Sequence, residues 1–266
     1  MKMKKIIATA LSVTAVFSAC ALASCGGKEE LIVYTEAGFA PWEFTQKGST
    51  EIIGVDMEIA KYIAKKYDYS LKVVDGSFDS IVAGIKEDNA LGIAGITYDA
   101  TRAEAVEYST FYWGDAFQAV VYLKDSAPTL TDGAFAVSNF TGKNVVYQTG
   151  TTSQLTINEN ETTWGISSKK DYADVLVAFQ EVKADTYLIV DSQVAAQIVA
   201  ENANYAYAAI EGVEAEQYGV VAKKGNTALI EKVNAALEEL LKDDANGKNQ
   251  IEKWFDQYSA IAPDEE

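Results

Sequence analysis

Arginine occurs once in this chain of 266 residues, at Arg102, whereas lysine occurs 21 times. Lysine supplies positive charge everywhere else, so the lone arginine indicates a need for its planar guanidinium, which can hold both oxygens of a carboxylate. Arg102 follows the apolar segment 91–96 and therefore lies near the carboxyl end of an expected strand, where open α/β sheets place their ligands. The alternative is a surface arginine paired with Glu104 or Glu107.

Three other segments with polar or aromatic side chains also follow expected strands. Residues 35–43 form a loop that carries Phe39, residues 148–153 place hydroxyl groups at the start of an expected helix, and Asp191 ends the apolar segment 186–190. Hydroxyl groups at a helix N-terminus suit an anionic group. Taken singly, however, threonine-rich turns and strand-end aspartates are usually helix caps. Only the combination predicts a ligand site.

Apolar periodicity predicts strands that alternate with helices, which indicates α/β units on mainly parallel sheets. The strand-like segments are 31–35, 70–74, 91–96, 144–148 and 186–190. The helix-like segments are 55–67, 77–87, one that begins after Asp99, 151–157, 172–181, 192–201, 226–242 and 250–258, with Asp56, Ser77 and Asp99 as candidate caps. Two such sets predict two lobes. The apolar segments 117–123 and 218–222 flank the second set and are candidate crossing strands, which makes the first lobe discontinuous.

Composition excludes several functions. The chain has a net charge of −17, no histidine and two cysteines. So acidic a protein repels a nucleic-acid backbone, and without histidine it lacks the residues for typical zinc sites or for a Ser-His-Asp triad. Cys20 and Cys25 lie close together near the N-terminus, so we expect no disulfide framework. No P-loop or Gly-x-Gly-x-x-Gly motif is found, and we expect no metal and no cofactor.

The N-terminus is typical of a secretion signal. Lys2, Lys4 and Lys5 precede an apolar stretch at 6–17, which is too short for a good membrane-spanning helix. The sequence Leu-Ala-Ser-Cys that ends at Cys25 resembles the lipobox of bacterial lipoproteins. That resemblance implies a lipoprotein signal peptide at 1–24 and a lipid on Cys25, with 25–30 as a lipidated tether, and so an extracytoplasmic protein anchored to the cell membrane.

The alternative is an ordinary signal peptide followed by a coincidental cysteine. Without residues 1–24 the chain has 19 basic and 39 acidic residues and a net charge of −20. A surface of this charge is repelled by anionic membranes, so the lipid would provide the anchor.

An ordered series of motifs extends over about 31–258. It includes Thr-Glu-x-x-Phe-x-Pro-Trp-Glu-Phe at 35–44, Gly-Val-Asp-Met-Glu-Ile-Ala at 54–60, Phe-Asp-Ser-Ile at 78–81, Ala-Gly-Ile-Thr-x-x-x-x-Arg at 94–102, Gly-Thr-Thr at 150–152, Val-Asp-Ser at 190–192 and Tyr-Gly-Val at 218–220. The chain resembles the family 3 extracellular solute-binding proteins, the polar amino-acid receptors of ABC importers. The resemblance implies a type II periplasmic-binding-protein-like α/β fold, with two α/β lobes joined by two crossing strands.

The expected division places the first part of lobe one at 31–122, lobe two at 123–216, and the second part of lobe one with the C-terminal helices at 217–266. The resemblance implies a monomeric substrate-binding component of an ABC importer. It would bind a polar or basic L-amino acid as the lobes close about a hinge and would deliver it to the membrane permease. We therefore expect no catalysis and no nucleic-acid partner.

The resemblance also assigns roles to residues that match the family motifs. Arg102 would clamp the α-carboxylate of the ligand, and Thr97 and Thr152 would donate further hydrogen bonds to it. Asp191 would accept from the α-ammonium group, together with the backbone carbonyl of Gly95. Burying a zwitterion requires an opposite charge for each of its ends, which this arrangement supplies.

The side chain of the ligand would lie between Phe39 and Phe78, with Glu36 and Gln148 facing its polar end. An acid at position 36 favours a donor or a cation and leaves Gln, His, Lys, Arg and cystine all open. Asn89-Ala90 stands where family members often have Phe-Asp, and 156–172 match poorly, which puts ligand identity in doubt.

Two alternative functions remain. One is a cyclohexadienyl dehydratase-like enzyme on the same scaffold, in which Glu36 or Asp191 would act as a general acid. The other is a sensor or an adhesive module. The sequence does not name the permease.

Overall fold

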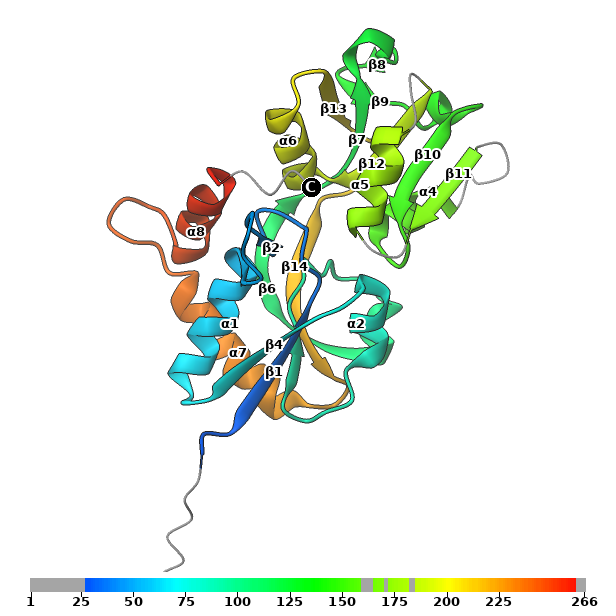
Figure 1. Ribbon diagram of the computed structural model, residues 1–266. Coiled ribbons are helices and arrows are strands. Elements are labelled where there is room, and N and C mark those ends of the chain that lie inside the picture. The colour runs from blue at the N-terminus through cyan, green and yellow to red at the C-terminus, as the bar shows by residue number, and fades with distance from the viewer. Residues whose placement is uncertain (1–26, 159–164, 170–171, 182–184, 262–266) are drawn as a thin grey trace, which may run out of the picture.

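The computed structural model describes residues 27–158, 165–169, 172–181 and 185–261, which form two lobes (Figure 1). The expected signal peptide and Cys25 lie outside the described residues. Among the residues that are described, no helix is both long and apolar enough to cross a membrane.

The first lobe is built on a five-stranded sheet in the order β4-β1-β5-β14-β6. Strand β1 runs parallel to β4 and β5, whereas β14 is antiparallel to β5 and β6. The strands are β1 Glu30–Thr35, β4 Ser70–Asp75, β5 Ala90–Gly92, β6 Val106–Ala116 and β14 Glu216–Lys223. The helices of this lobe are α1 Val55–Lys66, α2 Phe78–Gly84, α3 Arg102–Ala105, α7 Thr227–Leu240 and α8 Gln250–Ser259. In Figure 1, α1 and α7 lie on one side of the sheet and α2 on the other.

The second lobe contains a five-stranded sheet in the order β11-β10-β12-β7-β13. Strand β10 runs parallel to β11 and β12, and β7 is antiparallel to β12 and β13. The strands are β7 Gln118–Leu123, β10 Asn144–Gln148, β11 Gly165–Lys169, β12 Thr186–Asp191 and β13 Tyr205–Ala209. The helices are α4 Thr152–Asn158, α5 Tyr172–Glu181 and α6 Ser192–Glu201. Short elements complete the chain: β2 Phe44–Thr45, β3 Ile52–Ile53, β8 Leu130–Thr131, β9 Ala134–Phe135, η1 Lys124–Ser126 and η2 Val137–Phe140.

The alternation of strands and helices and the two-lobed α/β fold are confirmed. The chain crosses between the sheets twice, from β6 to β7 and from β13 to β14. Strand β7 already pairs with β12, through Val120 and Val121, so the first crossing lies near Phe117, a few residues before the expected boundary at 122. The Phe117 N–H donates to the Ser192 hydroxyl (3.2 Å), which ties this crossing to the start of α6.

Local details differ from the sequence expectation. Strand β5 ends at Gly92 rather than at residue 96, because Gly95 has a φ of +52°, which extended backbone does not allow. Helix α2 ends at Gly84 rather than at residue 87. Asp99 does act as the expected cap: its Oδ1 accepts from the backbone N–H groups of Thr101 (2.9 Å) and Arg102 (3.0 Å).

The expected capping role of Asp56 was wrong. Helix α1 begins after Gly54, and Asp56 lies inside its first turn. The Asp56 side chain is fully buried, and its Oδ2 accepts from the Gly95 N–H (2.8 Å) instead of from its own helix. The sequence spacing suited a cap, but a long-range backbone donor holds the carboxylate in the interior.

An aromatic cluster supports the loop that follows β1. Trp42 is fully buried, and the rings of four residues lie 5.0–6.2 Å from its ring: Tyr112, Trp113, Tyr218 and Phe255. These rings come from β6, β14 and α8. Aromatic pairs at such separations add to the stability gained from burial, so the cluster fixes the loop to the sheet beneath it.

Gly54→Ala should destabilise the protein by about 3 kcal/mol or more. Gly54 has a φ of +130°, and an added Cβ would lie 2.1 Å from the Trp42 carbonyl oxygen. Gly48→Ala is the matched control, because Gly48 also has a positive φ (+77°) but faces open space. We expect it to cost only about 1 kcal/mol. Urea unfolding measures both, and equal losses would contradict the role of the backbone contact.

Candidate ligand-binding site

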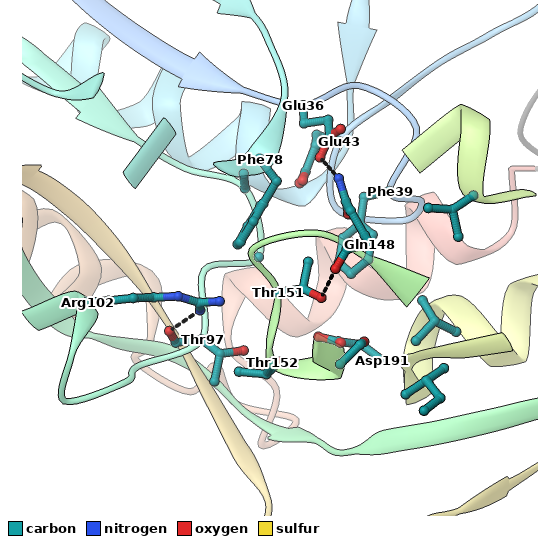
Figure 2. A pocket seen from close by; sticks show the side chains of 16 residues that line it. Glu36, Phe39, Glu43, Phe78, Thr97, Arg102, Gln148, Thr151, Thr152 and Asp191 are labelled. Carbon is teal, nitrogen blue, oxygen red and sulfur yellow. Dashed lines mark hydrogen bonds between the residues drawn. The ribbon is translucent and has the colours of Figure 1, made fainter. Parts of the chain in front are cut away.

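A cavity lies between the two lobes. It is lined by all nine ligand-site residues predicted from the sequence, namely Glu36, Phe39, Phe78, Gly95, Thr97, Arg102, Gln148, Thr152 and Asp191 (Figure 2). Most of them follow the carboxyl ends of β1, β5, β10 and β12, as expected for a ligand site on parallel strands. The sequence analysis missed seven lining residues: Glu43, Ala94, Thr151, Ser153, Val175, Ile189 and Val190.

Arg102 is the first residue of α3, and its guanidinium connects the two lobes. Its Nη1 donates to the Thr97 carbonyl (2.9 Å) and its Nη2 donates to the Gly150 carbonyl (2.7 Å) of the second lobe. The guanidinium also lies over the Phe78 ring, 5.3 Å from its centre. Within the part of the chain that the structure describes, Arg102 forms no ion pair with Glu104 or Glu107, and Glu107 pairs with Lys224 instead (3.5 Å).

The two threonines predicted to bind a carboxylate are oriented by residues of the crossing strands. The Thr97 hydroxyl donates to Glu216 Oε2 (2.8 Å). Gln118 Nε2 lies 3.2 Å from the Thr152 hydroxyl oxygen. Gln118 opens β7 and Glu216 opens β14, and both are buried. The sequence analysis identified neither, because Glu216 lies two residues before the Tyr-Gly-Val motif in a segment that contains other acids.

Asp191 is buried against donors from both crossing strands. Gln118 Nε2 donates to its Oδ1 (2.6 Å), and the Tyr218 hydroxyl donates to its Oδ2. Burial raises the pKa of Asp191 to about 7, and repulsion by Glu216 adds to this rise, while the two hydrogen bonds and Arg102 oppose it. Burial also raises the pKa of Glu216, which accepts from the same Gln118 amide (3.1 Å).

Glu36 and Gln148 meet at another side of the cavity (Figure 2). Gln148 Nε2 donates to Glu36 Oε2 (2.6 Å), and both side chains are buried. Because Glu36 follows β1 and Gln148 ends β10, this hydrogen bond also joins the two lobes.

Gly95 lies against the Phe39 ring. With a φ of +52°, its backbone takes a left-handed conformation, and an added Cβ would lie 3.0 Å from Phe39 Cε1. The ring can therefore rest on the backbone only because no side chain is present.

Gly150 is the point of close approach between the lobes. It has a φ of +84°, and an added Cβ would lie 3.0 Å from Asp79 Cβ, near the start of α2. Because the neighbouring atoms are the Cβ and Cα of Asp79 rather than the end of a flexible side chain, a larger residue at position 150 would force the two segments apart by a few tenths of an ångström.

The fold and this cavity define a two-lobed binding protein with a ligand site between its lobes. The sequence matches the bacterial extracellular solute-binding proteins, family 3, over residues 31–257. The chain belongs to this family, and membership indicates an extracytoplasmic location.

Several known proteins are similar over nearly the whole chain. The arginine-binding extracellular protein ArtP of Bacillus subtilis is 29% identical, with 96% of this chain and 98% of that protein covered. The arginine-bound form of truncated ArgBP from T. maritima has a TM-score of 0.71 at 29% identity, with 79% of this chain and 96% of that chain covered. An ancestral arginine-binding protein bound to glutamine has a TM-score of 0.73 at 29% identity, covering 88% of this chain and 99% of that chain.

Gly95→Ala should weaken ligand binding about tenfold or more. A side chain in this left-handed conformation costs about 1–3 kcal/mol, and its Cβ, 3.0 Å from Phe39 Cε1, would also push the Phe39 ring back by a few tenths of an ångström. Isothermal titration with L-arginine measures the change. Gly133→Ala is the control, because Gly133 also has a positive φ (+84°) but faces open space in the turn between β8 and β9. Binding as tight in Gly95→Ala as in the control would contradict this role of Gly95.

Proposed function

We propose that this chain is the substrate-binding component of an amino-acid ABC importer, and that its ligand is an L-amino acid with a cationic or amide side chain. The observation that carries the proposal is the charge distribution of the cavity. Arg102 is the only basic side chain among the described lining residues, whereas three acids line it: Glu36, Glu43 and Asp191. Relatives named as arginine-binding proteins support this ligand class.

The zwitterionic end of the ligand binds to two of the charged side chains of the cavity. Arg102 binds the α-carboxylate, and Asp191 accepts from the α-ammonium group. The hydroxyls of Thr97 and Thr152 become further donors to the carboxylate when the ligand turns them away from Glu216 and Gln118, which they contact in this structure. Charge-assisted hydrogen bonds of this kind contribute about 1.5–3 kcal/mol each. Glu36 then remains to interact with the side chain of the ligand. Its negative charge favours a cationic side chain, such as that of arginine, over an amide, and it excludes an acidic side chain.

Closure of the lobes completes the site. Arg102 and Glu36 belong to the first lobe, whereas Gln148, Thr152 and Asp191 belong to the second. A ligand that bridges the two sets binds the closed form better than the open form, and this difference shifts the population towards closure. The closed form is then recognised by the membrane permease of the importer.

We further propose that the chain acts as a monomer, as the family resemblance implies, and that a lipid on Cys25 holds it at the cell membrane. The observation that supports the lipid is the sequence before Cys25, namely a basic segment, an apolar stretch at 6–17 and then Leu-Ala-Ser.

A thermal-shift screen of residues 26–266 against the twenty amino acids, cystine and ornithine tests the proposal. A ligand present at 100 times its dissociation constant stabilises the folded state by about 2.7 kcal/mol. We expect the largest shift with L-arginine and its loss in Arg102→Ala. A screen in which no amino acid raises the melting temperature would overturn the proposal, and arogenate would then be tested as a substrate.

Glu36→Gln should separate cationic ligands from neutral ones. Removing the charge at this position should weaken L-arginine binding by at least tenfold and affect L-glutamine much less, because an amide side chain needs only a hydrogen-bond acceptor. Glu51→Gln, an exposed acid outside the cavity, is the control. An equal loss of affinity for both amino acids in Glu36→Gln would show that the ligand side chain does not contact Glu36.

Ligand affinity should rise with pH up to about 7, because Asp191 must be ionised to accept from the ammonium group and burial raises its pKa to about 7. Below that value, binding requires the loss of a proton, and affinity should fall by up to about tenfold for each pH unit. Titration calorimetry between pH 5 and 8 measures this. In Asp191→Asn the affinity should be weak and nearly independent of pH; a wild-type affinity that is constant over this range would contradict the assignment.

A further inference from the structure

Two carboxyl groups contact each other in the interior of the first lobe, behind the wall of the cavity. Glu43 is 1% exposed and lines the cavity, and Asp56, the second residue of α1, is completely buried. Their side chains are within hydrogen-bonding reach of one another. One oxygen of each, Glu43 Oε2 and Asp56 Oδ1, is buried and has no donor among the residues that the structure describes.

Two ionised carboxylates are not stable in this arrangement. The like charges repel each other away from water, and each unpaired oxygen has lost its hydrogen bonds to solvent. A single proton removes both problems, because a carboxylic acid can donate its O–H to the carboxylate beside it. The two unpaired oxygens are therefore explained if one group is an acid and the other its acceptor.

The donors around the pair show which group is ionised. Asp56 Oδ2 accepts from the Gly95 N–H (2.8 Å) and from the Tyr112 hydroxyl (3.0 Å). Asp56 also lies in the first turn of α1, a helix of 12 residues whose N-terminal end favours negative charge. The described residues provide no comparable set of donors to the side chain of Glu43.

We propose that Glu43 is a neutral acid at neutral pH, that it donates its proton to Asp56, and that this acid–carboxylate pair positions the ligand-facing surface of the first lobe. Burial raises the pKa of Glu43 well above its usual range, and the charges of Asp56, Glu36 and Asp191 raise it further. Burial also raises the pKa of Asp56, but only to about 6, because its hydrogen bonds with the Gly95 N–H, Glu43 and Tyr112 oppose the rise. The titratable groups that face the pair are thus Glu36, Asp191 and Tyr112.

The pair connects three segments of the cavity wall. The Glu43 carbonyl accepts from the backbone N–H groups of Gly38 (2.9 Å) and Phe39 (2.8 Å) and so closes the loop that carries the Phe39 ring. Asp56 holds the Gly95 backbone on which that ring rests. The shared proton joins the loop, the start of α1 and the segment at Gly95, and it limits the negative charge behind the cavity to one.

The proposal depends on the fold and does not depend on which amino acid the protein binds. Its first test uses the ligand-free protein with ¹³C-labelled glutamate carboxyl groups, observed by NMR. At neutral pH one glutamate signal should remain at the position of the protonated acid, and that signal should be missing in Glu43→Gln. A wild-type spectrum in which every glutamate is ionised at neutral pH would overturn the proposal.

Asp56→Asn provides a readout that a purely structural role would not change. The amide would donate to Glu43 while its oxygen keeps accepting from the Gly95 N–H, so the negative charge should move to Glu43. Its carboxyl signal should shift to the ionised position at neutral pH. A Glu43 signal that stays at the position of the protonated acid in Asp56→Asn would contradict the shared proton. If this variant does not fold, the comparison of the wild-type spectrum with that of Glu43→Gln shows whether Glu43 is protonated.

The dependence of stability on pH gives a second measurement. A carboxyl group whose pKa is raised on folding contributes most at a pH below its unfolded value of 4.5, and this contribution is lost as the pH rises towards the folded value. Glu43→Gln should therefore gain stability relative to the wild type as the pH rises from about 4.5. The exposed control Glu51→Gln should show no such trend. The same pH profile in Glu43→Gln and the wild type would contradict the proposal.

Binding of L-arginine as a probe tests the positioning role. Glu43→Ala removes the donor to Asp56 and should weaken binding tenfold or more, whereas the amide of Glu43→Gln replaces that donor and should restore most of the loss. Equal losses in the two variants would overturn the positioning role. If the wild type does not bind L-arginine at all, the proposed ligand class fails, and the NMR and stability results still decide the shared proton.

Discussion

The burial of negative charge around one cavity is the constraint on which the site depends. Five acids are buried there: Glu36, Glu43, Asp56, Asp191 and Glu216. A buried carboxylate is stable only with hydrogen-bond donors or an opposite charge, and Arg102 is the only arginine in the chain. The rest of the structure supplies donors, from the amide of Gln118 on one crossing strand to the hydroxyl of Tyr218 on the other. The same arrangement leaves the cavity short of positive charge.

This shortage links ligand binding to lobe closure. The donors and acceptors come from both lobes, as the bonds of Arg102 to Gly150 and of Gln148 to Glu36 show. The cationic ligand proposed above would add positive charge where the carboxylates converge, and it would reach all of them only with the lobes together. Glu216 and Gln118 are at the start of the strands that follow the crossings, so the residues next to the hinge belong to the same hydrogen-bond network.

The sequence predicted the residues that line the cavity better than those that support them. Motifs such as that ending at Arg102 are local, so the resemblance to the family could assign the lining residues one motif at a time. The supporting contacts join residues far apart in the chain, such as Asp56 to Gly95 and Thr97 to Glu216. No local pattern encodes such pairs, which is why Asp56 was interpreted as a helix cap. The early end of β5 depends likewise on the left-handed backbone of Gly95.

The contact between Gly150 and Asp79 sets a mechanical limit on the molecule. At this position the backbone of the second lobe lies against the base of a side chain of the first, and a Cβ added to Gly150 would lie 3.0 Å from Asp79 Cβ, so one of the two would have to move by a few tenths of an ångström. The glycine therefore lets the two lobes approach more closely here than alanine would. A methyl group at this position would hold the lobes slightly apart without changing any side chain that lines the cavity. This one position thus provides a way to vary the extent of lobe closure separately from the residues that recognise the ligand.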